Sequence, residues 1–281
     1  MLVRQAPFLL MLIASILGGC SKPPTSYSRN SPEAVLESAA LMIQNGEAKR
    51  LTELIYAENV QMRSLLNQIG LTFGSMADLA DALQDKFPNE IEEVRKQIEA
   101  DGGLNLIGQL AGPQTRGRRG PPVGGSNDSN RFQNLGKQIF ADPYGWLTRN
   151  NDKLDVIYIA DDTYGVMYDN KPLLQPWGVL IQKQTDGWYL MLPTNLPGAR
   201  EFMPKSDDEF MIWGSLFKTL ENGINDMTRD VNTGRTTSMN QLGQSAVEKF
   251  AIPAVMVMFA YTKHREAAQR ERREADKPAD G

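Results

Sequence analysis

An α+β fold is predicted for this chain, because the spacing of its apolar residues changes twice along the sequence. Between residues 31 and 100, apolar residues recur at intervals of three and four, the period of amphipathic helices. Between residues 154 and 192 they alternate with polar residues, as in half-buried strands, and after residue 206 the helical period returns. We therefore expect a helical N-terminal layer, a four-stranded antiparallel meander and two long C-terminal helices.

The N-terminal layer is expected to begin with a helix at Ser31, a good N-cap residue that is followed by proline at the first helical position. Asn45-Gly46 should end this helix, and a second one follows it. Gly70 is expected to end a later helix, and Ser75-x-x-Asp78 has the form of a capping box that opens the next. Pro88 should interrupt that helix.

Residues 101–130 have the composition of a loop, because glycine, proline, asparagine and serine dominate them. A loop of this length in a compact domain is typically flexible or forms an exposed lid. It carries Arg116, Arg118 and Arg119, which could bind phosphate, lipopolysaccharide or anionic headgroups. The alternative is a solvated loop with incidental charge, which we favour because no aromatic residue lies between the arginines.

The meander is expected to consist of two hairpins. Its four predicted strands are Leu154–Ala160, Thr163–Asp169, Trp177–Gln184 and Trp188–Leu192. Asp186-Gly187 is a typical two-residue hairpin turn, which would place Lys183 opposite Leu190 and Ile181 opposite Leu192. The predicted dry face of this hairpin holds Val179, Ile181, Trp188, Leu190 and Leu192.

Two long helices are expected after residue 205, the first of them opened by the capping box Ser206-x-x-Glu209. Its apolar stripe is Phe210, Trp213, Phe217, Leu220, Ile224, Met227 and Val231. The stripe could pack within the chain or form a coiled-coil seam between chains. In the second helix, the apolar run 250–261 is about 18 Å long, too short for a bilayer, and we expect it to be buried.

The first twenty residues have the order of a secretory signal, with Arg4, an apolar run and then small residues. They end in Leu17-Gly18-Gly19-Cys20, which resembles the lipobox of bacterial lipoproteins. The resemblance implies cleavage after residue 19 and acyl chains on Cys20 that hold the chain on a membrane of the bacterial cell envelope. Because Ser21 follows, it also implies sorting to the outer membrane.

These boundaries divide the chain into four parts. We expect a signal peptide at 1–19, a lipid anchor and tether at 20–30, a single α+β domain at 31–262 and a charged tail at 263–281. The alternative for the first part is an ordinary signal peptide with a chance cysteine. Cys20 is the only cysteine, so it has no partner for an intrachain disulfide, which favours the anchor.

A second resemblance covers residues 31–59. Ser31-Pro32-Glu33-Ala34-Val35 opens a helix, Asn45-Gly46-Glu47-Ala48 breaks it, and a second helix runs from Leu51 to Glu58. This order resembles the opening of the nuclear transport factor-two-like superfamily, whose domains end in a curved antiparallel sheet. The resemblance implies a pocket between the helices and the concave face of the sheet, and it requires a long helical insertion before that sheet.

The sequence contains no phosphate loop, dinucleotide fingerprint, metal-binding helix motif or nucleophile elbow. His264 is the only histidine, and we expect it to be exposed between Lys263 and Arg265. Zinc sites and imidazole-based triads are therefore not expected, and neither is a cofactor.

The tyrosines and carboxylates of the sheet are the remaining catalytic candidates. A two-residue turn at 161–162 would place Asp155 opposite Tyr168, with Tyr164 on the same face. Tyr158 and Asp162 are the other polar candidates for the pocket that the superfamily resemblance implies. A tyrosine paired with a carboxylate could transfer a proton, as in isomerase relatives of the superfamily. In the simpler interpretation these are ordinary strand tyrosines, and Asp155 is a surface carboxylate.

Three functions are compatible with these observations. The first is a non-catalytic envelope lipoprotein that binds a protein or an apolar ligand. The second is a small lyase or isomerase with a Tyr/Asp pocket, and the third is an assembly component joined through a coiled coil. The net charge of −4 gives no reason to expect nucleic acid as a partner. We favour the first function.

Acylation at Cys20 is the first testable prediction. In cells fed labelled palmitate, the wild-type chain should incorporate the label and the Cys20→Ser variant should not, because the thiol is the acylated group. Equal labelling of the two chains would exclude the lipid anchor.

Overall fold

The structure is a computed structural model, and it describes residues 26–100, 139–173, 178–192 and 203–275. The signal segment, Cys20 and the predicted loop 101–130 with its three arginines lie outside the described residues. Within them, the helices and one antiparallel sheet follow one another in the expected order. The α+β class is therefore confirmed.

Four helices form the N-terminal part. They are α1 (Pro32–Gln44), the 3-10 helix η1 (Ala48–Leu54), α2 (Val60–Lys86) and α3 (Pro88–Ala100). Ser31 caps α1 as expected, since its hydroxyl accepts a hydrogen bond from the Ala34 amide at 3.1 Å. Pro88 separates α2 from α3, also as expected. The second helix is a 3-10 helix, tighter than the α-helix.

Helix α2 differs from the prediction, because neither Gly70 nor Ser75 interrupts it. The helix is continuous over 27 residues, and its N-cap is Asn59, whose side chain accepts from the Met62 amide at 2.7 Å. Gly70 serves packing instead of helix termination. A Cβ at this position would lie 2.4 Å from the carbonyl oxygen of Lys49, so only glycine lets η1 approach α2 this closely.

The sheet follows two short helices, α6 (Gly145–Arg149) and η2 (Asn151–Lys153). Its strands are β1 (Leu154–Ala160), β2 (Thr163–Tyr168), β3 (Lys171–Pro172), β4 (Leu180–Gln184) and β5 (Gly187–Met191). They are paired in the order β1-β2-β4-β5, and the two-residue strand β3, which was not predicted, also pairs with β2. The expected four-stranded meander is therefore present with one short addition.

Both hairpins have a register that differs from the prediction. In the β4–β5 hairpin, Lys183 lies opposite Trp188 and Ile181 opposite Leu190, because the turn is Thr185-Asp186. This is a shift of two residues, so the side chains keep their predicted faces. In the β1–β2 hairpin a bulge between Tyr158 and Ala160 shifts the pairing by one residue.

The C-terminal part contains α8 (Asp207–Asn232) and α9 (Met239–Ala275). Ser206 caps α8 as expected, and the Glu209 side chain accepts from the Lys205 amide at 2.6 Å. At the C-terminal end of α8, Ile224, Met227 and Val231 are buried within the chain. This half of the stripe packs intramolecularly.

Helix α9 corrects one expectation, the burial of residues 250–261. The helix passes through Pro253 without a break and continues to Ala275, so it includes most of the charged segment 263–281. The run 250–261 was expected to be buried, but Val255, Met256 and Phe259 are 59%, 67% and 64% exposed. The reason is that α9 packs on α8, and among the described elements none packs on the opposite face of α9.

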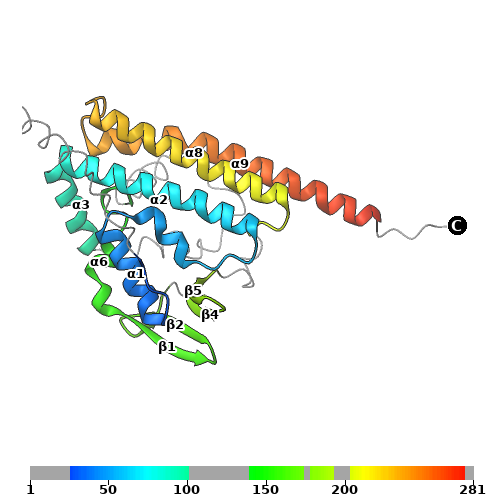
Figure 1. The fold of residues 1–281 in the computed structure, drawn as a ribbon. Helices are drawn as coiled ribbons and strands as arrows, with labels where there is room; N and C mark the ends of the chain where they lie inside the picture. Colours follow the sequence, from blue (N-terminus) through cyan, green and yellow to red (C-terminus); the bar gives the residue numbers. More distant parts are fainter. Residues whose placement is uncertain (1–25, 101–138, 174–177, 193–202, 276–281) are drawn as a thin grey trace, which may run out of the picture.

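The apolar core of the described residues consists of two clusters. One cluster joins α2, α3, α8 and α9 through residues such as Leu83, Ile91, Met227 and Leu242. The other joins α1, η1 and the sheet. Figure 1 shows the resulting layers, with α8 and α9 along one side, α2 beside them, and α1 and the sheet on the other side.

Two glycine substitutions test the packing of η1 on α2. Gly70→Ala should lower the free energy of unfolding by about 1–3 kcal/mol, because the new methyl group meets backbone atoms that cannot rotate away. Gly214→Ala in α8 is the control. Its Cβ would meet nothing within 4 Å, so the protein should gain about 0.5–1 kcal/mol from helix propensity. Denaturant unfolding measures both values, and equal effects would contradict the packing role of Gly70.

Candidate functional site

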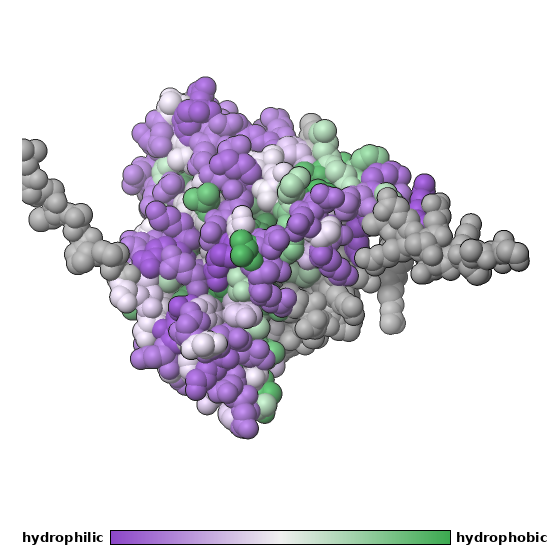
Figure 2. Space-filling model, turned by 45° about the vertical axis from the view of Figure 1, so that its right-hand side comes forward, coloured by the Kyte–Doolittle hydropathy of each residue, from purple (hydrophilic) through white to green (hydrophobic). Residues whose placement is uncertain are grey.

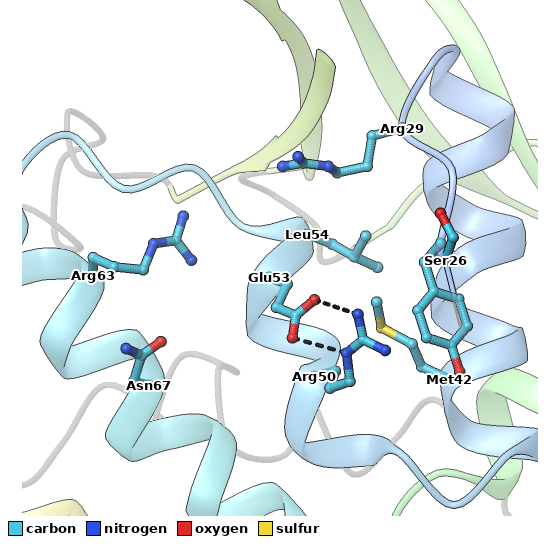
Figure 3. A pocket seen from close by; sticks show the side chains of 9 residues that line it. Ser26, Arg29, Met42, Arg50, Glu53, Leu54, Arg63 and Asn67 are labelled. Atoms are coloured by element: carbon cyan, nitrogen blue, oxygen red, sulfur yellow. Dashed lines mark hydrogen bonds and ion pairs between the residues drawn. The ribbon is translucent and has the colours of Figure 1, made fainter. Parts of the chain in front are cut away.

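The described residues line an open pocket of about 440 Å³ between the N-terminal segment, α1, η1 and α2. The residues that line it are Ser26, Tyr27, Arg29, Met42, Arg50, Glu53, Leu54, Arg63 and Asn67. Figure 3 shows that Arg29 and Arg63 face each other across it, while Arg50 and Glu53 rise from η1. Three guanidinium groups and one carboxylate thus surround one space.

Arg50 is held rigidly within η1. Its guanidinium forms a bidentate pair with Glu53 at 2.9 and 3.0 Å and a third bond to Glu47 at 2.9 Å. The guanidinium also stacks over the Tyr27 ring, 4.8 Å from the centroid. The hydrogen bond from Arg50 lowers the pKa of Glu47, and the bond to Glu53 raises the pKa of Arg50. Arg50 therefore stays charged, and its charge is matched by these two carboxylates.

Arg29 joins the N-terminal segment to the sheet. Its guanidinium lies 4.2 Å from the centre of the Tyr189 ring and 3.5 Å from the Asp186 carboxylate. Its carbonyl oxygen accepts a hydrogen bond from the Trp188 amide at 2.8 Å. The Tyr189 hydroxyl donates to Asp186 at 2.6 Å, and this bond is the main reason why the pKa of Asp186 is lowered. Asp186 is 66% exposed, so it screens the charge of Arg29 weakly.

Arg63 has a different environment from the other two arginines. It donates to the carbonyl oxygens of Thr52 and Ile55, each at 3.1 Å, which satisfies backbone groups at the end of η1. Among the described residues no carboxylate forms an ion pair with it. A guanidinium carries five N–H donors, so these two bonds leave donors for another acceptor. Arg63 is thus the arginine of the pocket that forms no ion pair with a carboxylate of the described residues.

This arrangement is suited to an anion. The lining carries three positive charges against the single negative charge of Glu53, while Glu47 and Asp186 lie outside the lining. A carboxylate or phosphate matches the planar fork of a guanidinium and can accept two parallel hydrogen bonds from it. Within the described part of the chain, no group of three or more His, Cys, Asp or Glu side chains could hold a metal ion.

The predicted pairing of Asp155 with Tyr168 is wrong. Because of the bulge in β1, Asp155 lies opposite Met167, and Tyr168 lies opposite Leu154. Asp155 is exposed, and its carboxylate accepts from the Val156 amide at 2.7 Å. The Tyr168 hydroxyl donates instead to the Asn150 side chain at 3.1 Å.

The other predicted tyrosines also lie away from the pocket. The Tyr158 hydroxyl donates to Asp161 at 2.9 Å, and this bond raises the pKa of Tyr158. The Tyr164 ring stands between those of Tyr158 and Trp188, at centroid distances of 5.8 and 5.4 Å. His264, which was expected to be exposed, is half-buried. None of these residues lines the pocket.

Sequence reasoning missed the arginines of the pocket. Arg29, Arg50 and Arg63 are separated by more than ten residues and form no motif. The one available signal was the placement of Glu47, Arg50 and Glu53 at intervals of three, which predicts ion pairs along a helix but not a pocket.

Comparisons with protein-family models, with curated proteins and with solved structures gave no match. The two resemblances noted in the sequence therefore stay predictions.

Proposed function

We propose that this protein is a non-catalytic, lipid-anchored binding protein of the bacterial cell envelope whose pocket holds the carboxylate or phosphate of its ligand. The observation that carries the proposal is the set of three guanidinium groups around one space. Arg63 contributes most, because its charge is not balanced by a neighbouring carboxylate. Charged hydrogen bonds of this kind are among the stronger ones in proteins.

The pocket is built to hold a ligand in a fixed position. The Tyr27 ring and two carboxylates fix Arg50, and the Tyr189 ring stacks against Arg29. Because these side chains are already ordered, the entropic cost of binding a ligand is lower. Met42 and Leu54 lie behind the lining and are almost completely buried, so polar and charged side chains form most of its surface and favour a ligand with an anionic group.

A binding role is favoured over catalysis because the proton-transfer pair expected from the sequence is not formed. Asp155 and Tyr168 are not opposite each other, and Asp155 is exposed. General acid–base catalysis requires groups within hydrogen-bond reach of the substrate, with a pKa adjusted by their environment. In the described pocket, the one carboxylate is Glu53, and Arg50 already binds it through two hydrogen bonds.

The proposed anchor would keep the pocket near the membrane. Ser26, Tyr27 and Arg29 of the expected tether line the pocket, and the Ser38 hydroxyl donates to the Ser28 carbonyl at 2.7 Å. The six residue-to-residue steps from Cys20 to Ser26 span at most about 20 Å when the chain is fully extended. An acylated Cys20 would therefore hold the pocket within this distance of the lipid headgroups, where a ligand released from the membrane is accessible.

Substitution of Arg63 tests the proposal. The full chain is titrated with inorganic phosphate, pyrophosphate, acetate and succinate by calorimetry. At least one of these anions should bind, and Arg63→Gln should weaken it by about 10- to 100-fold, the value of a charged hydrogen bond. Arg63→Lys keeps the charge but loses the fork, so it should weaken binding less.

The control is Arg229→Gln, which removes an equal charge from an exposed position on α8. It should bind the anion as the wild type does. The proposal fails if none of the four anions binds the wild type, or if Arg63→Gln and Arg229→Gln bind equally well.

A further inference from the structure

The outer face of α9 carries exposed apolar side chains next to basic ones. Val255, Met256 and Phe259 are all more than half exposed, and they lie at helical spacing on one face. Figure 2 shows hydrophobic residues gathered at the upper right of its view, on the upper side of the molecule along which α8 and α9 run in Figure 1. Lys263 and Arg270 continue the same face towards the C-terminal end and are exposed.

We infer that this face of α9, the stripe of Val255, Met256, Phe259, Lys263 and Arg270, lies on an anionic lipid surface. An exposed apolar helix face with adjoining basic residues is the pattern of helices that lie in the membrane interface. The inference goes beyond the proposed function, because it concerns a membrane contact made without the acyl group on Cys20.

Low burial distinguishes α9 from a core helix. Its segment Met239–Ala267 is long and apolar enough to cross a membrane by length and composition, but only 21% of the apolar window is buried. The core helix of a soluble protein with this composition is mostly buried. The exposed apolar side chains of α9 therefore have no partner among the described residues, and a lipid surface would cover them without a protein of matching shape.

The helix lies on the membrane and does not span it. The N-terminal half of α9 is packed into the protein, where Met239, Leu242 and Ala246 are buried against α8 and its neighbours. The remaining apolar part, residues 250–261, is about 18 Å long, whereas the hydrocarbon core of a bilayer is about 30 Å thick. Interfacial helices insert only about 5–10 Å, a depth that these side chains can reach.

Charge complementarity identifies anionic lipids as the surface. The Lys263 ammonium lies 5.7 Å from the Phe259 ring centre, so the cation is close to the apolar patch. Glu266 pairs with Lys263 at 3.0 Å and reduces this charge. The chain adds Arg270, Arg272 and Arg273 against Glu271 and Glu274, which leaves the end of the helix with a net positive charge. A negative headgroup layer attracts such a segment.

A site-specific fluorescence experiment tests the inference. In the full chain, Cys20→Ser removes the only cysteine, and either Met256→Cys or Leu71→Cys then supplies one position for a bimane label. Leu71 is the control, because it is an exposed apolar residue on α2, outside the stripe. Vesicles contain equal amounts of phosphatidylglycerol and phosphatidylcholine, with brominated acyl chains as the quencher.

The label at position 256 should be quenched several-fold more than the label at position 71, and pure phosphatidylcholine vesicles should have a weak effect. The double change Lys263→Gln and Arg270→Gln should weaken binding to anionic vesicles by about fivefold for each charge removed. The matched change Lys218→Gln and Arg229→Gln on α8 should leave the quenching at position 256 as it was.

Two results would overturn the inference. Equal quenching at positions 256 and 71 would mean that the stripe does not enter the lipid, even if the N-terminal segment binds the vesicle. If the fluorescence of the label at position 256 changes with protein concentration in the absence of vesicles, a second copy of the chain covers the stripe. Neither result bears on anion binding by the pocket, so the two proposals fail independently.

Discussion

The close contact between η1 and α2 is the constraint on which the rest of the structure depends. Gly70 lets the Lys49 carbonyl and the Thr52 hydroxyl approach the backbone of α2 to distances that no Cβ would permit. About two turns earlier on α2, Arg63 binds the carbonyl oxygens of Thr52 and Ile55. These two contacts fix η1 along its length.

Through η1, the same contact connects the two halves of the protein. Immediately after η1, Ile55 forms a bridge to Leu190 of β5, and the Tyr56 amide donates to the Leu190 carbonyl at 2.9 Å. On the other side, α2 packs against α8, and α8 against α9. The sheet and the long helices are thus joined by seven residues of 3-10 helix, and the pocket with its arginines lies on this joint.

Local signals predicted the elements well. The caps at Ser31 and Ser206 and the break at Pro88 were identified because each depends on neighbouring residues alone. Gly70 was misjudged for the opposite reason. A glycine that ends a helix and a glycine that admits a neighbouring backbone are identical in the sequence, and only the position of Lys49 distinguishes them.

The site was harder to predict than the fold, because its residues meet only in three dimensions. The bulge in β1 could not be identified from the alternation of apolar and polar residues. A shift of one residue in the pairing of β1 with β2 was enough to separate Asp155 from Tyr168. Arg29 and Arg63 come together through the packing of η1. The apolar run of α9 looked like core because hydrophobicity alone cannot show whether a helix has a neighbour on each side.

The central claim is that the packing of η1 on α2 creates an anion site, and side-chain NMR tests it most directly. Arginine Nε–Hε signals are followed while inorganic phosphate is added to the wild type and to Gly70→Ala. The account predicts that the Arg63 and Arg29 signals shift together and saturate in the wild type, that Arg229 does not respond, and that Gly70→Ala loses the selective response. Uniform, unsaturated shifts of all the arginines in both proteins would contradict it.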